Sequence, residues 1–521
     1  MRNDTGRWAV LFLISAVLFG AMVRFAPTLL AHSAINDGGM FYAMIEDLKA
    51  NGLRLPAYTS YNHLNIPFAY PPLSLYAGAI LAAIGIPTGE VIRWLPALVS
   101  TLSILAFFWM ASQMTGSRSV ASMATVAYAL MPRTFSWYVM GGGLSRSLGI
   151  LFLLLTCGSA WTLFGKPSWG RIALTALFGA GAVLSHPETG LHALGSCALI
   201  WLFRGRNARG LRDAALVALG VLLFTSPWWG TVLAQDGLAP IRSALSTGGH
   251  SGLFWTPWIT MDFAEERFAT VITVLGLIGF VVKCIRRDWF LPVWLLVPFV
   301  IEPRSATAIA ALPLAILAGY GLADFVIPKI ASLASGTPAE GADWTSYMED
   351  SRAVKLMLAY VLFSMFVGAF AYDLSLARYV IPDASKEAMQ WVHGNTPEGS
   401  RFVVLTGRPD AFSDPSTEWF PVLADRTSVN TVQGQEWTLG SKFMPVLYDL
   451  PKLQACLNAG PACVEKWATD HKAGFDYLYL EKPADETAAE PSGLLLYQLR
   501  QDSQYSLVFE NSGVAVFERK Q

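Results

Sequence analysis

Asn36-Asp37-Gly38-Gly39-Met40-Phe41-Tyr42 is the stretch on which the interpretation of the whole chain depends. It follows an apolar run, Trp8 to Leu30, which is long enough to cross the ~30 Å hydrocarbon core of a bilayer. No small-residue cleavage site precedes Asp37, so we interpret this run as a retained membrane anchor and not as a signal peptide. A free carboxylate therefore comes directly after the first span, which indicates a site at a membrane surface.

The composition is that of a polytopic membrane protein. Of the 521 residues, 53% are hydrophobic and only 14% are charged, and the mean hydropathy is +0.42. These charges are too few to cover a soluble globule of this length. The formal net charge of −1 and the lack of a basic stripe argue against a nucleic-acid partner.

Eleven transmembrane helices are predicted. Three basic connectors, at residues 166–171, 204–212 and 283–287, are assigned to the cytoplasm because cytoplasmic loops carry an excess of Lys and Arg. Alternation then places the N-terminus in the cytoplasm and the C-terminal region outside a plasma or inner membrane. The predicted spans are Trp8–Leu30, Val91–Ala111, Val120–Met131, Leu144–Phe164, Ile172–Leu184, Leu191–Phe203, Ala214–Leu233, Ala269–Val282, Phe290–Ile301, Ala306–Ile327 and Val354–Tyr372.

The apolar segment Pro71–Ile86 is not counted as a span. It is short for one, and counting it would turn the basic cluster at residues 204–212 to the outside. We interpret it as an interfacial or re-entrant helix, so that residues 31–90 form one large external loop.

A second helix is predicted within this loop. Its apolar residues recur at helical spacing, and we expect it to lie along the membrane plane. Asp37 stands at its N-terminus, where it either caps the helix or acts in a site. Gly38 and Gly39 favour the site, because they permit close backbone approach by a ligand and are poor choices for a first turn. The apolar residues are Met40, Phe41, Met44, Ile45 and Leu48.

The order of these features resembles the GT-C superfamily of membrane glycosyltransferases. Asp37 and the Phe41-Tyr42 pair are followed by Phe68-Ala69-Tyr70-Pro71-Pro72-Leu73 and by Arg93-Trp94-Leu95-Pro96 at the entrance to the next span. The pattern is most similar to protein O-mannosyltransferases and lipid A aminoarabinose transferases, and it covers roughly residues 1–325.

This resemblance implies a sugar donor linked to polyprenyl phosphate and transfer at the external face. The usual catalytic base of the family, a carboxylate in the first external loop, falls on Asp37. An arginine at the start of a late span commonly holds the donor phosphate, and Arg304 fits that place. Its planar guanidinium suits phosphate oxygens. The alternatives for Arg304 are snorkelling to the interface or pairing with Glu302.

Further candidate substrate-binding residues are Tyr70, Arg133, Arg146, His186, Glu188 and His250. The loop 132–143 carries no acidic residue, which weakens the case for a divalent metal held by two carboxylates. We expect no cofactor, although a metal is not excluded. Arg133, Arg146 and the glycine run 141–143 are expected to bind an anionic group.

His186 and Glu188 are expected to line the cavity of Asp37; alternatively, they pair with each other and cap the next helix. His250 lies in a segment rich in glycine, serine and tryptophan, and it is a candidate ligand contact.

The chain is divided into a GT-C-like membrane domain (residues 1–326), a cytoplasmic linker (327–352), a last transmembrane helix (353–373) and an extracytoplasmic α/β domain (374–521). In this last domain we predict a helix at Ser385–Val392, strands at Phe402–Leu405 and Tyr477–Leu480, and a hairpin that turns at residues 511–513. A disulfide between Cys456 and Cys463 is expected in an oxidising compartment. Asp425 and Arg426 are expected to form a buried ion pair.

The predicted function is transfer of a sugar from a polyprenyl-phosphate donor to a protein, lipid or glycan acceptor at the external membrane face. The alternative is a flippase or transporter of lipid-linked glycans, although the two halves show no internal repeat. A catalytically inactive scaffold with the same fold is a third possibility.

Overall fold

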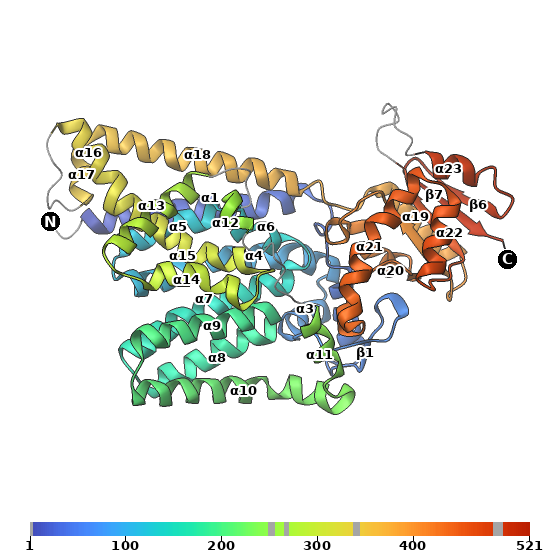
Figure 1. Cartoon of the computed structure of the whole chain (residues 1–521), viewed down its shortest axis with the longest axis horizontal. Coiled ribbons are helices and arrows are strands. Elements are labelled where there is room, and N and C mark those ends of the chain that lie inside the picture. The colour runs from blue at the N-terminus through green and yellow to red at the C-terminus, as the bar shows by residue number, and fades with distance from the viewer. Residues whose placement is uncertain (1–3, 248–255, 265–269, 337–343, 483–492, 521) are drawn as a thin grey trace.

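The computed structural model describes residues 4–247, 256–264, 270–336, 344–482 and 493–520. A bundle of long helices forms one part of the molecule, and a smaller domain with a β-sheet lies at one end of it (Figure 1). The predicted polytopic helical fold with a C-terminal α/β domain is therefore confirmed.

Each of the eleven predicted spans coincides with a helix over its described residues. Within the described residues, six helical segments are long and apolar enough to cross a membrane, namely Gly6–Leu30, Thr88–Thr115, Gly143–Gly165, Ala208–Asp236, Ala306–Ser335 and Arg352–Leu376. The other five predicted spans fall on shorter or less apolar helices, so the number of spans stays a prediction. The bundle helices are α1 (Asp4–Leu30), α4 (Thr88–Thr115), α5 (Arg118–Leu130), α7 (Gly143–Gly165), α8 (Trp169–Ser185), α9 (Pro187–Arg204), α10 (Ala208–Asp236), α13 (Val271–Ile285), α14 (Phe290–Ile301), α15 (Ala306–Gly321), the π-helical turn η3 (Leu322–Val326), α16 (Ile327–Ser335), α17 (Trp344–Asp350) and α18 (Arg352–Leu376).

Polar residues between the apolar runs determine where several bundle helices begin. The side chains of Ser117, Ser168 and Asn207 accept the backbone N–H of Val120, Arg171 and Gly210, respectively. Each bond satisfies one of the amide groups that a helix N-terminus leaves without a partner. The connectors between spans therefore carry their own helix start signals. The segment predicted as a linker begins with α16, which continues the helix of the preceding span.

The two ends of the bundle differ. The N-terminus lies at the end remote from the C-terminal domain (Figure 1). Helix α10 runs from its basic N-terminal connector to the C-terminal domain, where Ser243 of the following α11 (Ala239–Ser246) donates to the Glu436 carbonyl oxygen at 2.7 Å. The basic connector 204–212 and the C-terminal domain therefore lie at opposite ends, as the alternation of spans requires.

The segment 31–90, predicted as the first external loop, folds against the C-terminal domain. Its helices are α2 (Gly39–Ala50) and α3 (Leu73–Ala83), and β1 (Tyr58–Thr59) pairs antiparallel with β2 (Ile66–Pro67) near the short helix η1 (Tyr61–His63). Helix α3 has 11 residues, in keeping with its exclusion from the spans. The apolar face of α2 is buried in one cluster with residues of the C-terminal sheet. Protein therefore covers this face, and the expectation that the helix lies along the membrane plane stays a prediction.

The C-terminal domain has a five-stranded sheet in the order β4-β3-β5-β7-β6. Strand β3 is parallel to both β4 and β5, and β7 is antiparallel to β5 and β6. The predicted helix, strands and hairpin are confirmed. Asn511 closes the hairpin by accepting the N–H groups of Gly513 (3.0 Å) and Val514 (2.8 Å). The elements are α19 (Asp383–Asn395), β3 (Arg401–Leu405), η4 (Ala411–Ser413), α20 (Pro415–Leu423), β4 (Thr427–Ser428), η5 (Gln435–Trp437), η6 (Gly440–Lys442), α21 (Phe443–Ala455), η7 (Cys456–Asn458), α22 (Pro461–Asp470), β5 (Tyr477–Glu481), α23 (Leu494–Leu499), β6 (Tyr505–Glu510) and β7 (Val514–Arg519).

Cys456 and Cys463 form the expected disulfide. The expected ion pair between Asp425 and Arg426 is absent. Buried Arg426 donates instead to Thr396 and to the carbonyl oxygen of His393, whereas the Asp425 carboxylate faces His63 at 3.2 Å. Backbone carbonyl groups therefore accept hydrogen bonds from the Arg426 guanidinium, for which Asp425 was the predicted partner.

Candidate active site

Asp37 lies in the turn between α1 and α2, and its side chain is held by the start of α7. Its Oδ1 atom accepts the N–H of Gly142 at 2.8 Å, and its Oδ2 atom lies 3.1 Å from a guanidinium nitrogen of Arg146. The N-cap position of α2 belongs to Gly38, and no side chain of the α2 turn itself caps the helix. Of the two roles left open for Asp37, helix capping is therefore excluded.

The glycine run packs directly on Asp37. A Cβ atom on Gly141 would lie 1.8 Å from the Asp37 carbonyl oxygen, and one on Gly142 would lie 2.1 Å from Oδ2. Gly38 has a φ of +131°, a conformation that favours glycine. The glycines were expected to allow a ligand to approach. They allow two protein segments to approach, and the anionic group bound by the Gly142 amide is the Asp37 carboxylate.

A cavity of about 380 Å³, with several charged side chains in its lining, opens beside the Asp37–Arg146 pair. Five predicted site residues line it together, although they come from three separate parts of the chain. Two further lining residues, Asp410 and Phe412, belong to the C-terminal domain. The cavity therefore lies between the end of the helical bundle and that domain. The predicted lining residues are Arg133, Arg146, His186, Glu188 and Arg304.

Arg304 reaches this cavity from the start of α15. Its side chain is 55% exposed, lies 3.7 Å from a Glu188 carboxylate oxygen, and stands 5.4 Å from the ring centre of Phe412. Glu302 does not pair with the guanidinium. Its carboxylate accepts the backbone N–H groups of Arg304 (3.0 Å) and Ser305 (2.8 Å). Glu302 thus satisfies the amides at the start of α15 and leaves the Arg304 side chain to the cavity.

His186 and Glu188 have different partners. Glu188 has Arg304 as its ion-pair partner, so the expected alternative of a His186–Glu188 pair does not occur. His186 lines the cavity and meets the ring of Tyr70 edge-on at 6.4 Å. Tyr70 itself is buried, and its hydroxyl lies 2.9 Å from Ser145 Oγ. Tyr70 is therefore placed behind His186 and is not among the lining residues.

Arg133 lies at the same wall, with one guanidinium nitrogen 3.5 Å from Asp262. Arg146 stacks over Trp137 with its guanidinium carbon 5.4 Å from the ring centre. The Nη1 atom of Arg146 is buried and has no hydrogen-bond partner in the part of the chain that the structure describes. His250 lies outside the described residues.

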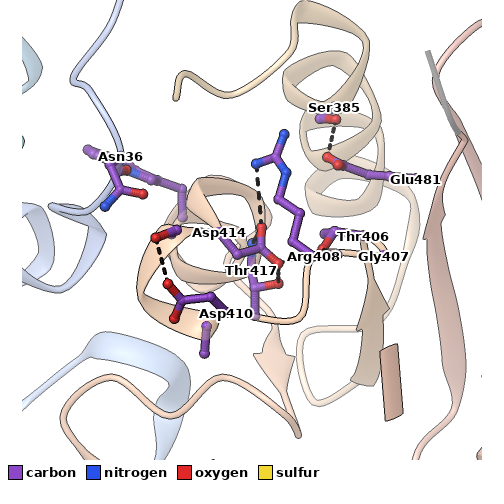
Figure 2. Close-up of polar contacts among 12 residues, drawn as sticks. Asn36, Ser385, Thr406, Gly407, Arg408, Asp410, Asp414, Thr417 and Glu481 are labelled. Carbon is purple, nitrogen blue, oxygen red and sulfur yellow. Dashed lines mark hydrogen bonds and ion pairs between the residues drawn. The ribbon is translucent and has the colours of Figure 1, made fainter. Parts of the chain in front are cut away.

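The contribution of the C-terminal domain was missed by the sequence analysis. Asp410 and Phe412 follow β3, at the carboxyl edge of the parallel strands, where ligands of open α/β sheets commonly bind. Asp414 organises this turn by accepting the hydroxyls of Thr406 and Thr417, and it lies 3.8 Å from Arg408 (Figure 2). The sequence offered one indication of these two residues, namely that they follow the predicted strand Phe402–Leu405.

The same turn touches the segment that carries Asp37. Asn36 stands beside it in Figure 2, and its side-chain amide donates to the Phe412 carbonyl oxygen at 2.8 Å. The indole N–H of Trp419 donates to the Asn36 carbonyl oxygen at 3.0 Å. The backbone N–H of Asn36 donates to the Tyr379 carbonyl oxygen at 2.6 Å. The C-terminal domain thus binds the residue that precedes Asp37 from several sides.

These residues do not match a divalent-metal site. Among the described residues no group of three or more His, Cys, Asp or Glu side chains is placed to hold a metal ion. Both Asp37 oxygens face donors, an amide and a guanidinium, where a two-carboxylate site needs a second acid. The basic groups of the cavity fit an anionic ligand instead.

No family model and no curated protein matches the sequence. Solved structures do match. The aminoarabinose transferase ArnT from Cupriavidus metallidurans, bound to undecaprenyl phosphate, is 16% identical over 98% of this chain and 97% of its own, with a TM-score of 0.57. The oligosaccharyltransferase AglB from Archaeoglobus fulgidus, in complex with an inhibitory peptide and a dolichol-phosphate, is 14% identical over 91% and 69%, with a TM-score of 0.54. The arabinofuranosyltransferase AftD from Mycobacteria is 14% identical over 99% and 42%, with a TM-score of 0.55.

Proposed function

We propose that this chain, which has the fold of the GT-C membrane glycosyltransferases, transfers a sugar from a polyprenyl-phosphate donor to an acceptor at the membrane surface. One observation carries the proposal. Asp37 is paired with Arg146 at a cavity that Arg133 and Arg304 also line, at the end of an apolar helical bundle. A lipid-linked phosphate needs cationic groups at the level where the lipid leaves the bilayer, and a glycosyl acceptor needs a base nearby.

The arginines are assigned to the donor phosphate. Arg304 is the most exposed of the three cavity arginines, at 55% against 30% for Arg146 and 16% for Arg133, and its weak contact with Glu188 at 3.7 Å leaves its N–H groups available. A guanidinium keeps its charge at every relevant pH and binds two phosphate oxygens at once. Arg304 thus holds the phosphate in the bound donor and stabilises the negative charge that grows on it as it leaves.

Asp37 is assigned as the general base. The acceptor oxygen attacks the anomeric carbon of the sugar, and the bond from that carbon to the phosphate oxygen breaks. The bonding electrons leave with the lipid phosphate, and the acceptor proton passes to the Asp37 carboxylate. Arg146 and the Gly142 amide orient this carboxylate, because each binds one of its oxygens.

We assign no metal ion to this reaction. This choice rests on the two contacts of the Asp37 carboxylate oxygens, which are the Gly142 amide and the Arg146 guanidinium. Three arginines at the cavity supply the positive charge that a divalent ion supplies elsewhere.

The proposed partners are a lipid carrier of the polyprenyl-phosphate type, membrane lipids, and an acceptor of protein, lipid or glycan nature. The ArnT and AglB structures contain undecaprenyl phosphate and a dolichol-phosphate, which supports this class of carrier. The proposed location is a plasma or inner membrane with the cavity and the C-terminal domain outside, because the basic connectors lie at the other end of the bundle.

The test uses purified protein in detergent with a panel of undecaprenyl-phosphate-linked hexoses and pentoses that carry a labelled sugar, and with a detergent extract of membranes as the source of protein, lipid and glycan acceptors. We expect release of undecaprenyl phosphate with one member of the panel, and loss of release in Asp37→Asn, which keeps the shape of the side chain but not its basicity. A flippase would bind these lipids without releasing lipid phosphate, since no bond is broken. Wild-type turnover by Asp37→Asn would remove the catalytic role of Asp37.

A further inference from the structure

We propose that Glu418 of the C-terminal domain is a positioning residue for Asp37, so that the soluble domain completes the active site and does more than cover it. The proposal rests on the proposed function, because it concerns the geometry of the proposed base. Its evidence is a contact between two segments that lie 380 positions apart in the sequence.

Glu418 binds the amide that directly follows Asp37. Both of its carboxylate oxygens lie within hydrogen-bond distance of the Gly38 backbone N–H, at 3.0 and 3.1 Å. Gly38 is the N-cap residue of α2. A carboxylate from α20 therefore binds the start of this helix, which is one of the two roles predicted for Asp37. Because Glu418 satisfies the start of α2, the Asp37 side chain is free to turn toward Gly142 and Arg146.

Glu418 is itself fixed in place. Glu418 is only 4% exposed, and its backbone carbonyl oxygen accepts the Tyr61 hydroxyl at 2.7 Å. A Cβ atom on Gly39 would lie 2.8 Å from that same carbonyl oxygen. The two backbones are therefore in direct contact, and a movement of α20 is transmitted to the turn that carries Asp37.

A purely structural role explains Glu418 poorly. No Lys, Arg or His side chain within the described ranges forms an ion pair with it, although it is buried. Burial, and secondarily the negative charge of Asp37, raise the pKa of Glu418 to about 8. A buried carboxyl without a cationic partner costs stability compared with an apolar side chain, and such groups are found preferentially at functional sites.

The protonation state of Glu418 determines the charge next to the turn that carries Asp37. Below its pKa the carboxyl is neutral and resembles a glutamine; above it, a negative charge stands beside Asp37. The charged and titratable groups that face Glu418 are Asp37, Arg146 of α7 and Tyr61 of η1. Ionisation of Glu418 therefore adds a negative charge next to the turn that positions Asp37.

The experiment compares Glu418→Ala and Glu418→Gln with a matched control, Glu481→Ala. Glu481 is a partly buried carboxyl of the C-terminal domain whose pKa is also raised by burial, and it accepts the Ser385 hydroxyl away from Asn36 (Figure 2). Two readouts are used. One is release of undecaprenyl phosphate from the donor panel between pH 6 and 9. The other is hydrogen–deuterium exchange of the peptide that contains residues 36–42.

We expect Glu418→Ala to lower kcat by about 100-fold, the typical cost of a misplacement of about 1 Å, with little change in KM for the donor. Glu418→Gln should match the wild-type rate at pH 6.5, where the Glu418 carboxyl is neutral, and should differ from the wild type as the pH passes 8, where ionised Glu418 carries a charge that glutamine lacks. Glu418→Ala should speed amide exchange at residues 36–42, and Glu481→Ala should change neither readout beyond its effect on stability.

The results separate the two proposals. Absence of lipid-phosphate release by the wild type would reject the proposed function, and the exchange measurement would still decide whether Glu418 fixes the Asp37 turn. An active wild type whose rate, pH profile and exchange match those of Glu418→Ala would overturn the positioning role. Equal losses in Glu418→Ala and Glu481→Ala would reduce Glu418 to a general contributor to stability, which also contradicts the proposal.

Discussion

Replacement of Gly142 by alanine adds one methyl group at the candidate base. Gly142 has a φ of −66°, so alanine causes no backbone strain there. The added Cβ would lie 2.1 Å from Asp37 Oδ2 and 2.7 Å from its Cγ, whereas Cβ atoms essentially never approach other atoms more closely than 3.0 Å. The carboxylate must therefore move by about 0.9 Å, the difference between 3.0 and 2.1 Å.

A displacement of about 1 Å at a reacting group costs about 100-fold in rate, or about 2.7 kcal/mol of activation free energy. Overpacking of this kind also costs about 1–3 kcal/mol of stability. We expect Gly142→Ala to fold with a lowered Tm and to release undecaprenyl phosphate about 100-fold more slowly than the wild type.

The matched control is Gly170→Ala in α8, where an added Cβ would meet no atom within 4 Å. Its rate should equal that of the wild type. The measurement is the initial rate of lipid-phosphate release in detergent at equal amounts of folded protein. If folded Gly142→Ala retained a rate within about twofold of the control, far from the loss of about 100-fold expected for a displaced base, the assignment of Asp37 would be refuted.

Three other predictions follow from the same structure. Arg304→Ala should raise KM for the donor and lower kcat. Arg304→Lys should recover only part of the wild-type KM and kcat, because lysine lacks the planar fork of the guanidinium. Full recovery by lysine would contradict this, since it would show that a positive charge alone holds the phosphate. Cys456→Ser with Cys463→Ser should lower the stability of the C-terminal domain by about 2.5 kcal/mol, from the entropy of a loop of this length, as measured by thermal unfolding; an unchanged Tm would contradict this. Burial raises the folded-state pKa of Glu418 from 4.5 to about 8, so the wild type should lose stability as the pH rises from about 4.5 to about 8. Glu418→Gln should lose less stability over the same range, as measured by Tm against pH. Parallel Tm curves for the two proteins would contradict this prediction.

The helical bundle was predictable because its signals are local. Long apolar runs define the spans, and polar connectors such as Ser117 and Asn207 begin the next helix with their own side chains. The hairpin at Asn511 was predictable for the same reason, since its turn is closed by one residue of the turn. Each of these features depends on neighbours within a few positions.

The candidate site was only partly predictable. Asp37, Arg146 and Arg304 were identified by residue type and by place in the chain. The structure brings Arg146 and Arg304 to one cavity, and Asp37 is paired with Arg146 beside it. The sequence did not show that Gly142 would bind Asp37, nor that Glu418 would replace it at the start of α2. Both contacts join segments more than 100 positions apart, and no periodicity or spacing in the chain encodes them.

The apolar face of α2 illustrates the same limit. Amphipathic periodicity indicates that one face is covered, but it does not say by what. The structure places Met40 and Ile45 in one cluster with Phe402 and Phe420 of the C-terminal domain, a cover that the periodicity did not identify. Only the tertiary fold determines what buries the apolar face of α2.

A structure of the protein with undecaprenyl phosphate bound, determined by cryo-electron microscopy, tests the central claim most directly. We predict that the phosphate lies in the cavity between Arg304 and Arg146, within hydrogen-bond distance of both guanidinium groups, with space for a sugar between it and Asp37. A phosphate bound at another place on the bundle, with the cavity of Asp37 closed to it, would contradict the account.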